Sequence, residues 1–365
     1  MESAVAPQAV AGPSWKARLG ARSRAAALIP IVMDLPGLAM LARRLTPTPR
    51  VETIDVDGIS VSVTSPAGPG PFPAWVFVTG AHPLRRREPV VQRLAEGLAR
   101  SRYVALVPDL PGLGEGQLTS NTLDAAVKVI ETALRRPDVR GRVALVGASA
   151  GASLALLAGA RESLCDRISV VVSIAPFADL RKILCLATTR RYDDGRDYEV
   201  TTLLRRAVGR SVAAALPASE ERERLLVQLG TIEDEGHDPF DPLDPDTALP
   251  EALTTPLVRL FANRDPARFD ELYEALPSEV RLAVGKLSPL AVATRVRAPV
   301  ELAVAPQDPY FPTGEAEALA AALPNVRLTI TSTLDHTRPM ASLGRLSGLR
   351  KFEAFVVRGL AAAAA

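Results

Sequence analysis

The chain has 365 residues, of which 47% are hydrophobic, and its formal net charge is +2. This length and composition suffice for a large buried core, and the near balance of 43 Lys and Arg against 41 Asp and Glu residues argues against a nucleic-acid partner. The two cysteines, Cys165 and Cys185, are too few for a disulfide framework and fit a reducing compartment, so a cytoplasmic location is expected.

Residues 1–50 are predicted to form an N-terminal helical segment. They contain the apolar run AAALIPIVM at 25–33, preceded by basic residues, a pattern that secretory signals share. Pro30 interrupts the run, which is also shorter than the ~20 apolar residues that cross a bilayer. The favoured interpretation is a segment that packs on the protein or on a partner. Peripheral membrane contact through residues 15–45 and a cleaved signal, with secretion, are the alternatives.

Residues 51–179 follow the rhythm of an alternating α/β domain. Residues 51–66 are predicted to form two strands around the turn dipeptide Asp57-Gly58. Short apolar runs with the length of buried strands follow, separated by segments with helical spacing. The predicted strands are 74–80, 103–116 with its Pro- and Gly-rich end, 142–147 and 168–177, and the predicted helices are 88–101, 122–136 and one that begins near 150. This alternation predicts a mostly parallel sheet.

The rhythm stops at residues 180–290, which are predicted to be a helical insertion. Helical spacing occurs at 198–216, 219–229 and 265–276. Asp265 before Pro266 is typical of a helix start. Residues 291–365 return to the alternating pattern, with predicted strands at 298–306 and 326–334 and predicted helices at 314–323 and 349–360. One α/β domain is therefore expected to be interrupted by helices.

A lone polar residue stands where a predicted strand meets a predicted helix. The sequence GASAG places Ser149 between Gly147 and Gly151. The glycines remove side chains where the strand and the helix would collide, so the serine can occupy the tip of a sharp, strained turn. The helix that follows directs its free N–H groups and positive dipole end to the same place. This context predicts that Ser149 is a nucleophile.

A serine hydroxyl needs a base to take its proton, and histidine is the usual one. The chain has three candidates, His82, His237 and His336. In hydrolases whose nucleophile stands at such a strand-to-helix turn, the chain order is serine, then acid, then histidine. His336 comes late enough and follows a predicted strand, so it is the predicted base. His82 is a candidate for lining the site, and His237 has no expected role in proton transfer.

The base must be oriented by a carboxylate. Asp308 follows the predicted strand at 298–306 and precedes His336 by one strand and one helix, so it is the favoured acid. Asp179, at the end of the predicted strand at 168–177, is the alternative. A turn or helix-capping role is the competing interpretation of Asp308, because Pro309 follows it.

An acyl-transfer site also needs two N–H donors for the developing oxyanion. One is expected from Ala150, directly after the nucleophile, and the other from the loop after the strand at 74–80. In that loop Gly80 lets the chain turn close to the site, Ala81 is the first choice of donor, and His82 is the second. The basic run that follows, residues 85–87, is typical of a solvated face, with attraction of an anionic substrate as the alternative.

Together these residues resemble a known family. The sequences GASAG, VTGAHP, VPDLPGLGEG, APVELAVAPQDPYFP and LDHTRP look like the alpha/beta-hydrolase superfamily, and more narrowly its serine esterase and dienelactone-hydrolase-like branch. The resemblance covers residues 51–179 and 290–360 and implies that the insertion is a cap or lid. Two departures matter: Thr79-Gly80 replaces the His-Gly start common in the oxyanion loop, and the nucleophile is serine where dienelactone hydrolase has cysteine.

The sequence therefore predicts a serine hydrolase that cleaves a carboxylic ester through an acyl-enzyme, with no metal and no cofactor. Its partner is expected to be a small-molecule ester with an apolar portion. An acyltransferase, thioesterase or peptidase with the same triad is the alternative, followed by a non-catalytic binding protein on the same scaffold. The oligomeric state and the identity of the substrate do not follow from the sequence.

Overall fold

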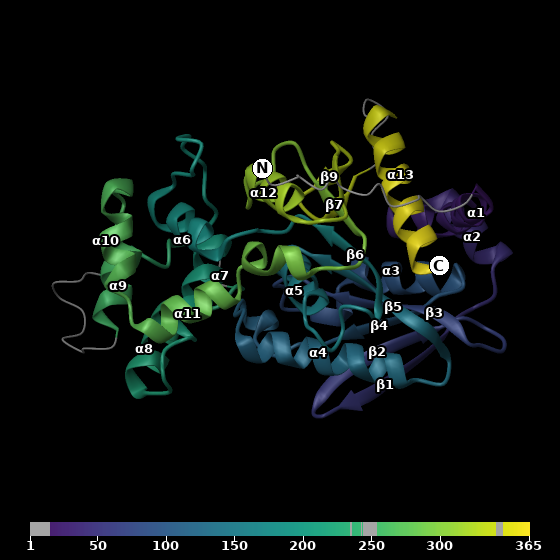
Figure 1. Ribbon diagram of the computed structural model, residues 1–365, viewed down its shortest axis with the longest axis horizontal. Coiled ribbons are helices and arrows are strands. Elements are labelled where there is room, and N and C mark those ends of the chain that lie inside the picture. Colours follow the sequence, from purple (N-terminus) through teal and green to yellow (C-terminus); the bar gives the residue numbers. More distant parts are fainter. Residues whose placement is uncertain (1–14, 234–235, 242, 244–253, 341–345) are drawn as a thin grey trace, which may run out of the picture.

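A computed structural model describes residues 15–233, 236–241, 243, 254–340 and 346–365 (Figure 1). An eight-stranded sheet lies at its centre, in the order β1-β2-β4-β3-β5-β6-β7-β8. The strands are β1 (Arg50–Val56), β2 (Ile59–Ser65), β3 (Phe72–Val78), β4 (Val104–Pro108), β5 (Val139–Ala148), β6 (Ile168–Ile174), β7 (Val300–Val304) and β8 (Val326–Ile330). Neighbours from β4 to β8 pair in parallel, whereas β2 is antiparallel to both β1 and β4. The prediction of an α/β fold with a mostly parallel sheet is confirmed.

Helices cover both faces of the sheet and form a separate group beyond one end of it (Figure 1). The helices of the sheet layers are α1 (Trp15–Val32), α2 (Pro36–Leu45), α3 (Pro89–Arg100), α4 (Ser120–Arg135), α5 (Ala150–Gly159), α12 (Thr313–Ala322) and α13 (Leu346–Ala363). The group between β6 and β7 comprises α6 (Leu180–Thr189), α7 (Thr202–Ala213), α8 (Glu220–Gln228), α9 (Thr255–Ala262), α10 (Phe269–Glu274) and α11 (Ser278–Lys286).

The edge hairpin forms where the sequence predicts it. Val56 pairs with Ile59 across a two-residue loop in which Asp57 and Gly58 have φ of 52° and 82°. Positive φ at both central residues matches the right-handed twist of the two strands.

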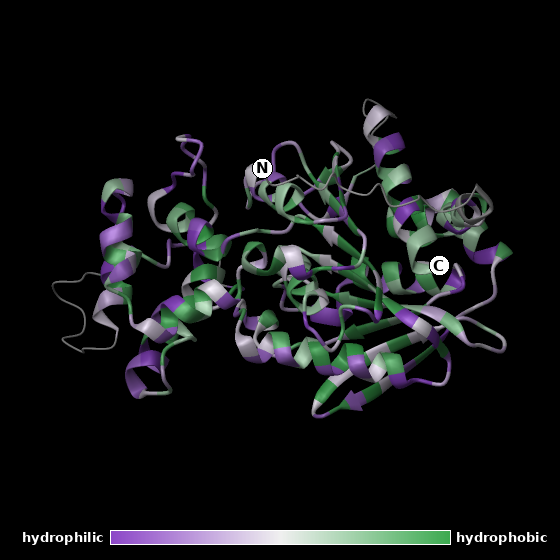
Figure 2. Cartoon of the chain, viewed as in Figure 1, coloured by the Kyte–Doolittle hydropathy of each residue, from purple (hydrophilic) through white to green (hydrophobic). Residues whose placement is uncertain are grey.

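The parallel strands divide the core into two layers because successive side chains point to opposite faces of a sheet. On β3, Val76 and Val78 join the larger cluster with residues of α4 and α5, whereas Trp75 and Phe77 join a second cluster with residues of α1, α3 and α13. Figure 2 shows the hydrophobic colouring along the central strands and the mixed colouring of the helices that cover them.

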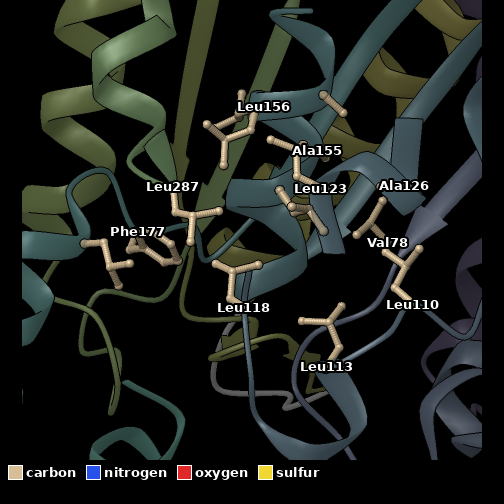
Figure 3. Packing of buried hydrophobic residues seen from close by; sticks show 14 of the residues in the cluster. Val78, Leu110, Leu113, Leu118, Leu123, Ala126, Ala155, Leu156, Phe177 and Leu287 are labelled. Carbon is tan, nitrogen blue, oxygen red and sulfur yellow. The ribbon is translucent and has the colours of Figure 1, made fainter. Parts of the chain in front are cut away.

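The helical group shares the larger cluster with the sheet domain. Leu287, at the end of α11, belongs to the same packed cluster as Leu118, Leu156 and Phe177 (Figure 3). Polar contacts add to this packing: Arg210 of α7 donates to the carbonyl of Glu115 at 2.8 Å. These contacts fix the group against the loop that follows β4.

In two predicted elements, part of the predicted range belongs to a different element in the structure. The helix predicted at 265–276 is a 3₁₀ turn (Pro266–Arg268) followed by α10, and Asp265 caps it by accepting from the backbone of Ala267 at 2.9 Å. The strand predicted at 326–334 stops at Ile330, since Leu334 lies in the short pair formed by β9 (Leu334–Asp335) and β10 (Arg338–Pro339). Residues 233–246, in the loop that links α8 to α9, alternate acidic residues with prolines, and part of this stretch lies outside the described residues.

The N-terminal segment packs on the sheet domain through α1. A Cβ at Gly97 of α3 would lie 2.6 Å from Leu28 Cδ1, so this glycine lets the two helices approach closely. In contrast, α2 exposes large apolar side chains, namely Leu38, Met40, Leu41 and Leu45. No helix among the described residues is long and apolar enough to cross a membrane. Peripheral membrane contact and a cytoplasmic location remain predictions.

Candidate active site

Ser149 lies between β5 and α5 in a conformation that side chains rarely adopt. Its φ is 55° and its ψ is −128°. A Cβ at Gly147 would collide with the Gly151 carbonyl oxygen, and a Cβ at Gly151 would collide with the carbonyl oxygens at the end of β3. The two glycines therefore make the tight turn possible, and the surrounding packing holds Ser149 in its strained conformation.

The N-terminus of α5 and the loop after β3 meet beside this serine. Ala150 is the first residue of α5, where backbone N–H groups have no partner within the helix. A Cβ at Gly80 would lie 3.1 Å from both Ser149 Cβ and the Ala148 carbonyl oxygen, so the loop passes in direct contact with the serine. Gly80 and Ala81 thus lie at the same sheet edge as Ala150.

The basic run after this loop anchors it to the domain. The Arg86 backbone N–H and guanidinium both donate to the carboxylate of Asp109, at 3.2 and 2.9 Å, and both side chains are largely buried. Arg85 is paired with Glu115. The prediction that this run forms a solvated face is wrong for Arg86. Its partner Asp109 follows β4, so the two residues become neighbours only in the folded sheet.

His336 and Asp308 form a close pair. His336 Nδ1 lies 2.8 Å from Asp308 Oδ2 and 3.0 Å from Oδ1. Asp308 Oδ1 also accepts from the backbone N–H groups of Tyr310 and Phe311, at 2.9 and 3.0 Å. The carboxylate side chain is 1% exposed and the imidazole 13%. A carboxylate at Nδ1 favours the tautomer with the proton on that nitrogen, which leaves Nε2 as the acceptor.

An aromatic side chain packs on the imidazole. The Tyr310 ring centroid lies 4.5 Å from that of His336. Burial raises the pKa of the Tyr310 phenol, so the ring stays neutral at physiological pH. Tyr310 was not singled out from the sequence. The signal available there was its position two residues after Asp308, inside the turn that the aspartate caps.

One cavity of about 740 Å³ collects the candidate residues, which are Ser149, Ala150, Gly80, Ala81, His82 and His336. Asp308 contacts His336 but is not among the described residues that line this cavity. The backbone N–H of Leu84 donates to Nδ1 of His82 at 3.2 Å.

The remaining candidates lie elsewhere. Asp179 caps α6 by accepting from the backbone of Arg181 at 2.9 Å, and it receives a longer bond from Ser288. His237 is exposed in the helical group. Neither belongs to the described residues that line the cavity. The carboxylate that contacts His336 is that of Asp308, and Asp179 serves as a helix cap.

Comparison with known proteins places the chain in a family. A model described as "Alpha/beta hydrolase family" matches residues 68–343, which is more than half of the chain. The chain therefore belongs to the alpha/beta hydrolase family, in agreement with its sheet topology. None of the curated proteins compared with the chain matches it.

Several solved structures are similar to this chain. Dipeptidyl peptidase 4 of Porphyromonas gingivalis is 14% identical with a TM-score of 0.50, over 88% of this chain and 37% of the other. The 2,6-dihydroxy-pseudo-oxynicotine hydrolase is 16% identical with a TM-score of 0.49, over 89% and 72%. Est1E from Butyrivibrio proteoclasticus is 17% identical with a TM-score of 0.45, over 84% and 96%. At these identities the likeness concerns the fold alone.

Proposed function

We propose that the protein is a serine hydrolase that cleaves a carboxylic ester through an acyl-enzyme. The observation that carries the proposal is the strained turn that presents Ser149 to the cavity lined by His336, whose Nδ1 contacts the buried carboxylate of Asp308. The same three residue types in these roles form the triad of serine hydrolases.

The proposed reaction has two half-reactions. Nε2 of His336 takes the proton of the Ser149 hydroxyl while the serine oxygen attacks the ester carbonyl. The N–H groups of Ala150 and Ala81 stabilise the oxyanion. Collapse of the tetrahedral intermediate breaks the bond to the alcohol, which leaves with the proton from His336. Water then attacks the acyl-enzyme, gives its proton to His336, and the acid is released as the serine regains its proton.

The helices inserted between β6 and β7 are proposed to be the cap. Apolar residues of α6 and α7 line the same cavity as Ser149, among them Leu180, Ile183, Leu204 and Val208. A cover of this kind excludes water from the site and strengthens its electrostatic interactions. Its apolar character supports a substrate with an apolar portion.

The first experiment is a hydrolysis assay with p-nitrophenyl butyrate, combined with labelling by a fluorophosphonate probe. Wild-type protein is expected to turn over the ester and to be labelled, whereas Ser149→Ala is expected to do neither. Ser163→Ala is the matched control, since Ser163 is exposed and distant in the sequence from the strained turn. Undiminished turnover by Ser149→Ala would overturn the proposal. Competing alcohols, amines and thioesters in the assay would reveal transferase, peptidase or thioesterase activity.

A further inference from the structure

The cavity at Ser149 continues past the sheet edge into the layer between the sheet and helices α1, α3 and α13. On the sheet side it is lined by Trp75, Phe77, Val146 and Val172, which share one face of β3, β5 and β6. On the helix side it is lined by residues that include Ile29 of α1, Leu94 of α3 and Val356 of α13. We call this part, defined by these seven residues, the sheet-face chamber.

The sheet-face chamber extends well away from the nucleophile. Trp75 of β3 and Thr79, the residue directly after this strand, both line the cavity and are four positions apart in the chain. At about 3.3 Å per residue, this separation corresponds to roughly 13 Å. Thr79 directly precedes Gly80, the residue in contact with Ser149. A ligand group bonded to the serine can therefore extend along β3 between the sheet and the helices.

Every residue that defines the sheet-face chamber is apolar or aromatic. Three of them, Ile29, Leu94 and Val356, are only half-buried, although they belong to helices packed on the sheet. Filling the chamber with a hydrocarbon chain would remove these side chains from water, at a gain of about 25 cal/mol per Å² of apolar surface. The chamber is thus suited to a flexible apolar chain and unsuited to a charged group.

Hydrogen bonds between polar groups connect the helices at the far part of the chamber. Arg24 of α1 donates to the Tyr103 hydroxyl at 2.9 Å, and that hydroxyl donates to the Leu360 carbonyl of α13 at 2.7 Å. The Tyr103 ring packs edge-on against Trp75, with centroids 6.3 Å apart. These contacts hold α1 and α13 in place, so the chamber is a built feature of the fold.

We infer that the sheet-face chamber holds the acyl chain of the substrate, which makes esters of medium-length, unbranched fatty acids the substrate class. This inference rests on the proposed function of Ser149. It assigns the N-terminal helix α1 a role in the binding site, as one wall of the acyl-chain chamber. The cap helices α6 and α7 then cover the alcohol portion and the mouth of the site.

The test is a chain-length profile with p-nitrophenyl acetate, butyrate, octanoate, decanoate and palmitate. Wild-type kcat/KM is expected to rise from acetate to octanoate or decanoate. Val356→Trp fills the chamber and is expected to lower kcat/KM for decanoate by tenfold or more, roughly what a small change of fit in an apolar pocket produces, with little effect on acetate. Arg350→Trp is the matched control, because Arg350 is an exposed residue of the same helix.

A binding measurement separates this inference from the proposed function. Trp15 and Trp75 are the two tryptophans of the chain, and Trp75 lines the chamber. In a Trp15→Phe, Ser149→Ala background, decanoate is expected to change the Trp75 fluorescence saturably, and Leu94→Phe is expected to weaken that binding. The Leu94→Phe variant also serves if Val356→Trp does not fold.

The outcomes are distinguishable. Decanoate binding without any ester hydrolysis would refute the proposed function and leave the chamber as a fatty-acid site. Hydrolysis of short esters with no chain-length preference and no decanoate binding would overturn the inference and leave the proposed function intact. An equal decrease in kcat/KM for all the esters, in both Val356→Trp and Leu94→Phe, would also overturn the inference.

Discussion

The carboxylate of Asp308 lies 2.8 Å from Nδ1 of His336 and is at the same time fixed by two backbone N–H groups of its own turn. The acid is therefore oriented independently of the histidine. The backbone of the turn holds the carboxylate, and the carboxylate in turn holds the imidazole.

This arrangement predicts the effect of Asp308→Asn. The amide keeps the size of the side chain but favours the wrong imidazole tautomer, so kcat is expected to fall by about 10³–10⁴. Steady-state kinetics on p-nitrophenyl butyrate measure the loss. Asp179→Asn is the control, since Asp179 caps α6, and it is expected to retain near wild-type kcat. If Asp179→Asn lowered kcat more than Asp308→Asn does, Asp179 would be the acid in place of Asp308.

Gly80→Ala is predicted to impair catalysis without unfolding the protein. The new Cβ would lie 3.1 Å from Ser149 Cβ and from the Ala148 carbonyl oxygen, so the loop must shift by a few tenths of an ångström. Such a shift displaces the proposed oxyanion donor, whose complete loss raises the barrier by about 2.7–4 kcal/mol. Because the donor is displaced and not removed, we expect a smaller increase in the barrier, seen as a lower kcat with KM nearly unchanged.

Gly37→Ala provides the control for this prediction, because a Cβ at Gly37 of α2 has no described atom within 4 Å. Thermal unfolding should give similar midpoints for both variants. Full activity of Gly80→Ala would contradict the proposed path of the loop beside the serine.

The buried carboxyl of Glu315 is expected to make the stability of the protein depend on pH. Burial raises the pKa of its carboxyl above the usual 4.5. The folded state therefore binds the proton more tightly than the unfolded state, and the free energy of unfolding is expected to fall as pH rises from 4.5 towards the raised pKa. Glu315→Gln, which cannot ionise, should remove this slope in denaturant titrations, whereas Glu317→Gln, at an exposed position of the same helix, should preserve it.

A second variant at this position tests the hydrogen bonds of Glu315. Its oxygens accept from the backbone of Ala178 at 2.5 Å, from the backbone of Asp179 at 3.0 Å and from the Tyr192 hydroxyl. Glu315→Leu leaves these donors without an acceptor, and each unsatisfied group costs about 1–3 kcal/mol. Glu315→Leu is thus expected to be less stable than the wild type and to lack the pH slope that Glu315 produces. Unchanged stability of Glu315→Leu would show that this buried network contributes nothing.

The exposed face of α2 predicts peripheral membrane contact. Leu38, Leu41 and Leu45 are 56%, 50% and 75% exposed and follow helical spacing on one face. Sedimentation with anionic vesicles is expected to recover the wild-type protein, and Leu41→Glu combined with Leu45→Glu should reduce the bound fraction. Val227→Glu is the control, since Val227 is a highly exposed apolar residue of α8. Equal binding by both variants would argue against α2 as the contact.

The sequence predicted the parts of the site that depend on local chain chemistry. A glycine two positions before and two after Ser149 is required by the turn itself, and the collisions that a Cβ would make at either glycine give the physical reason. The pairing of Asp308 with His336 was predicted from chain order, because a parallel sheet brings the ends of successive strands to one edge.

The sheet-face chamber could not be predicted in this way. Its walls come from residues as far apart in the chain as Ile29 and Val356, and each reads in the sequence as an ordinary apolar helix position. Whether such residues pack fully or leave a cavity depends on helix placement, for which close approaches such as that of Gly359 to Val172 are decisive. The pairing of Arg86 with Asp109 had no local signal for the same reason.

Trapping the covalent intermediate tests most directly whether Ser149 is the nucleophile. Wild-type protein would be mixed with p-nitrophenyl butyrate, quenched in acid at early times, digested and examined by mass spectrometry. One butyryl group is expected on the peptide that contains Ser149, and its formation and hydrolysis must each be at least as fast as kcat. Ester hydrolysis with the acyl group on another residue, or with no acyl-enzyme while Ser149→Ala remains active, would contradict this expectation.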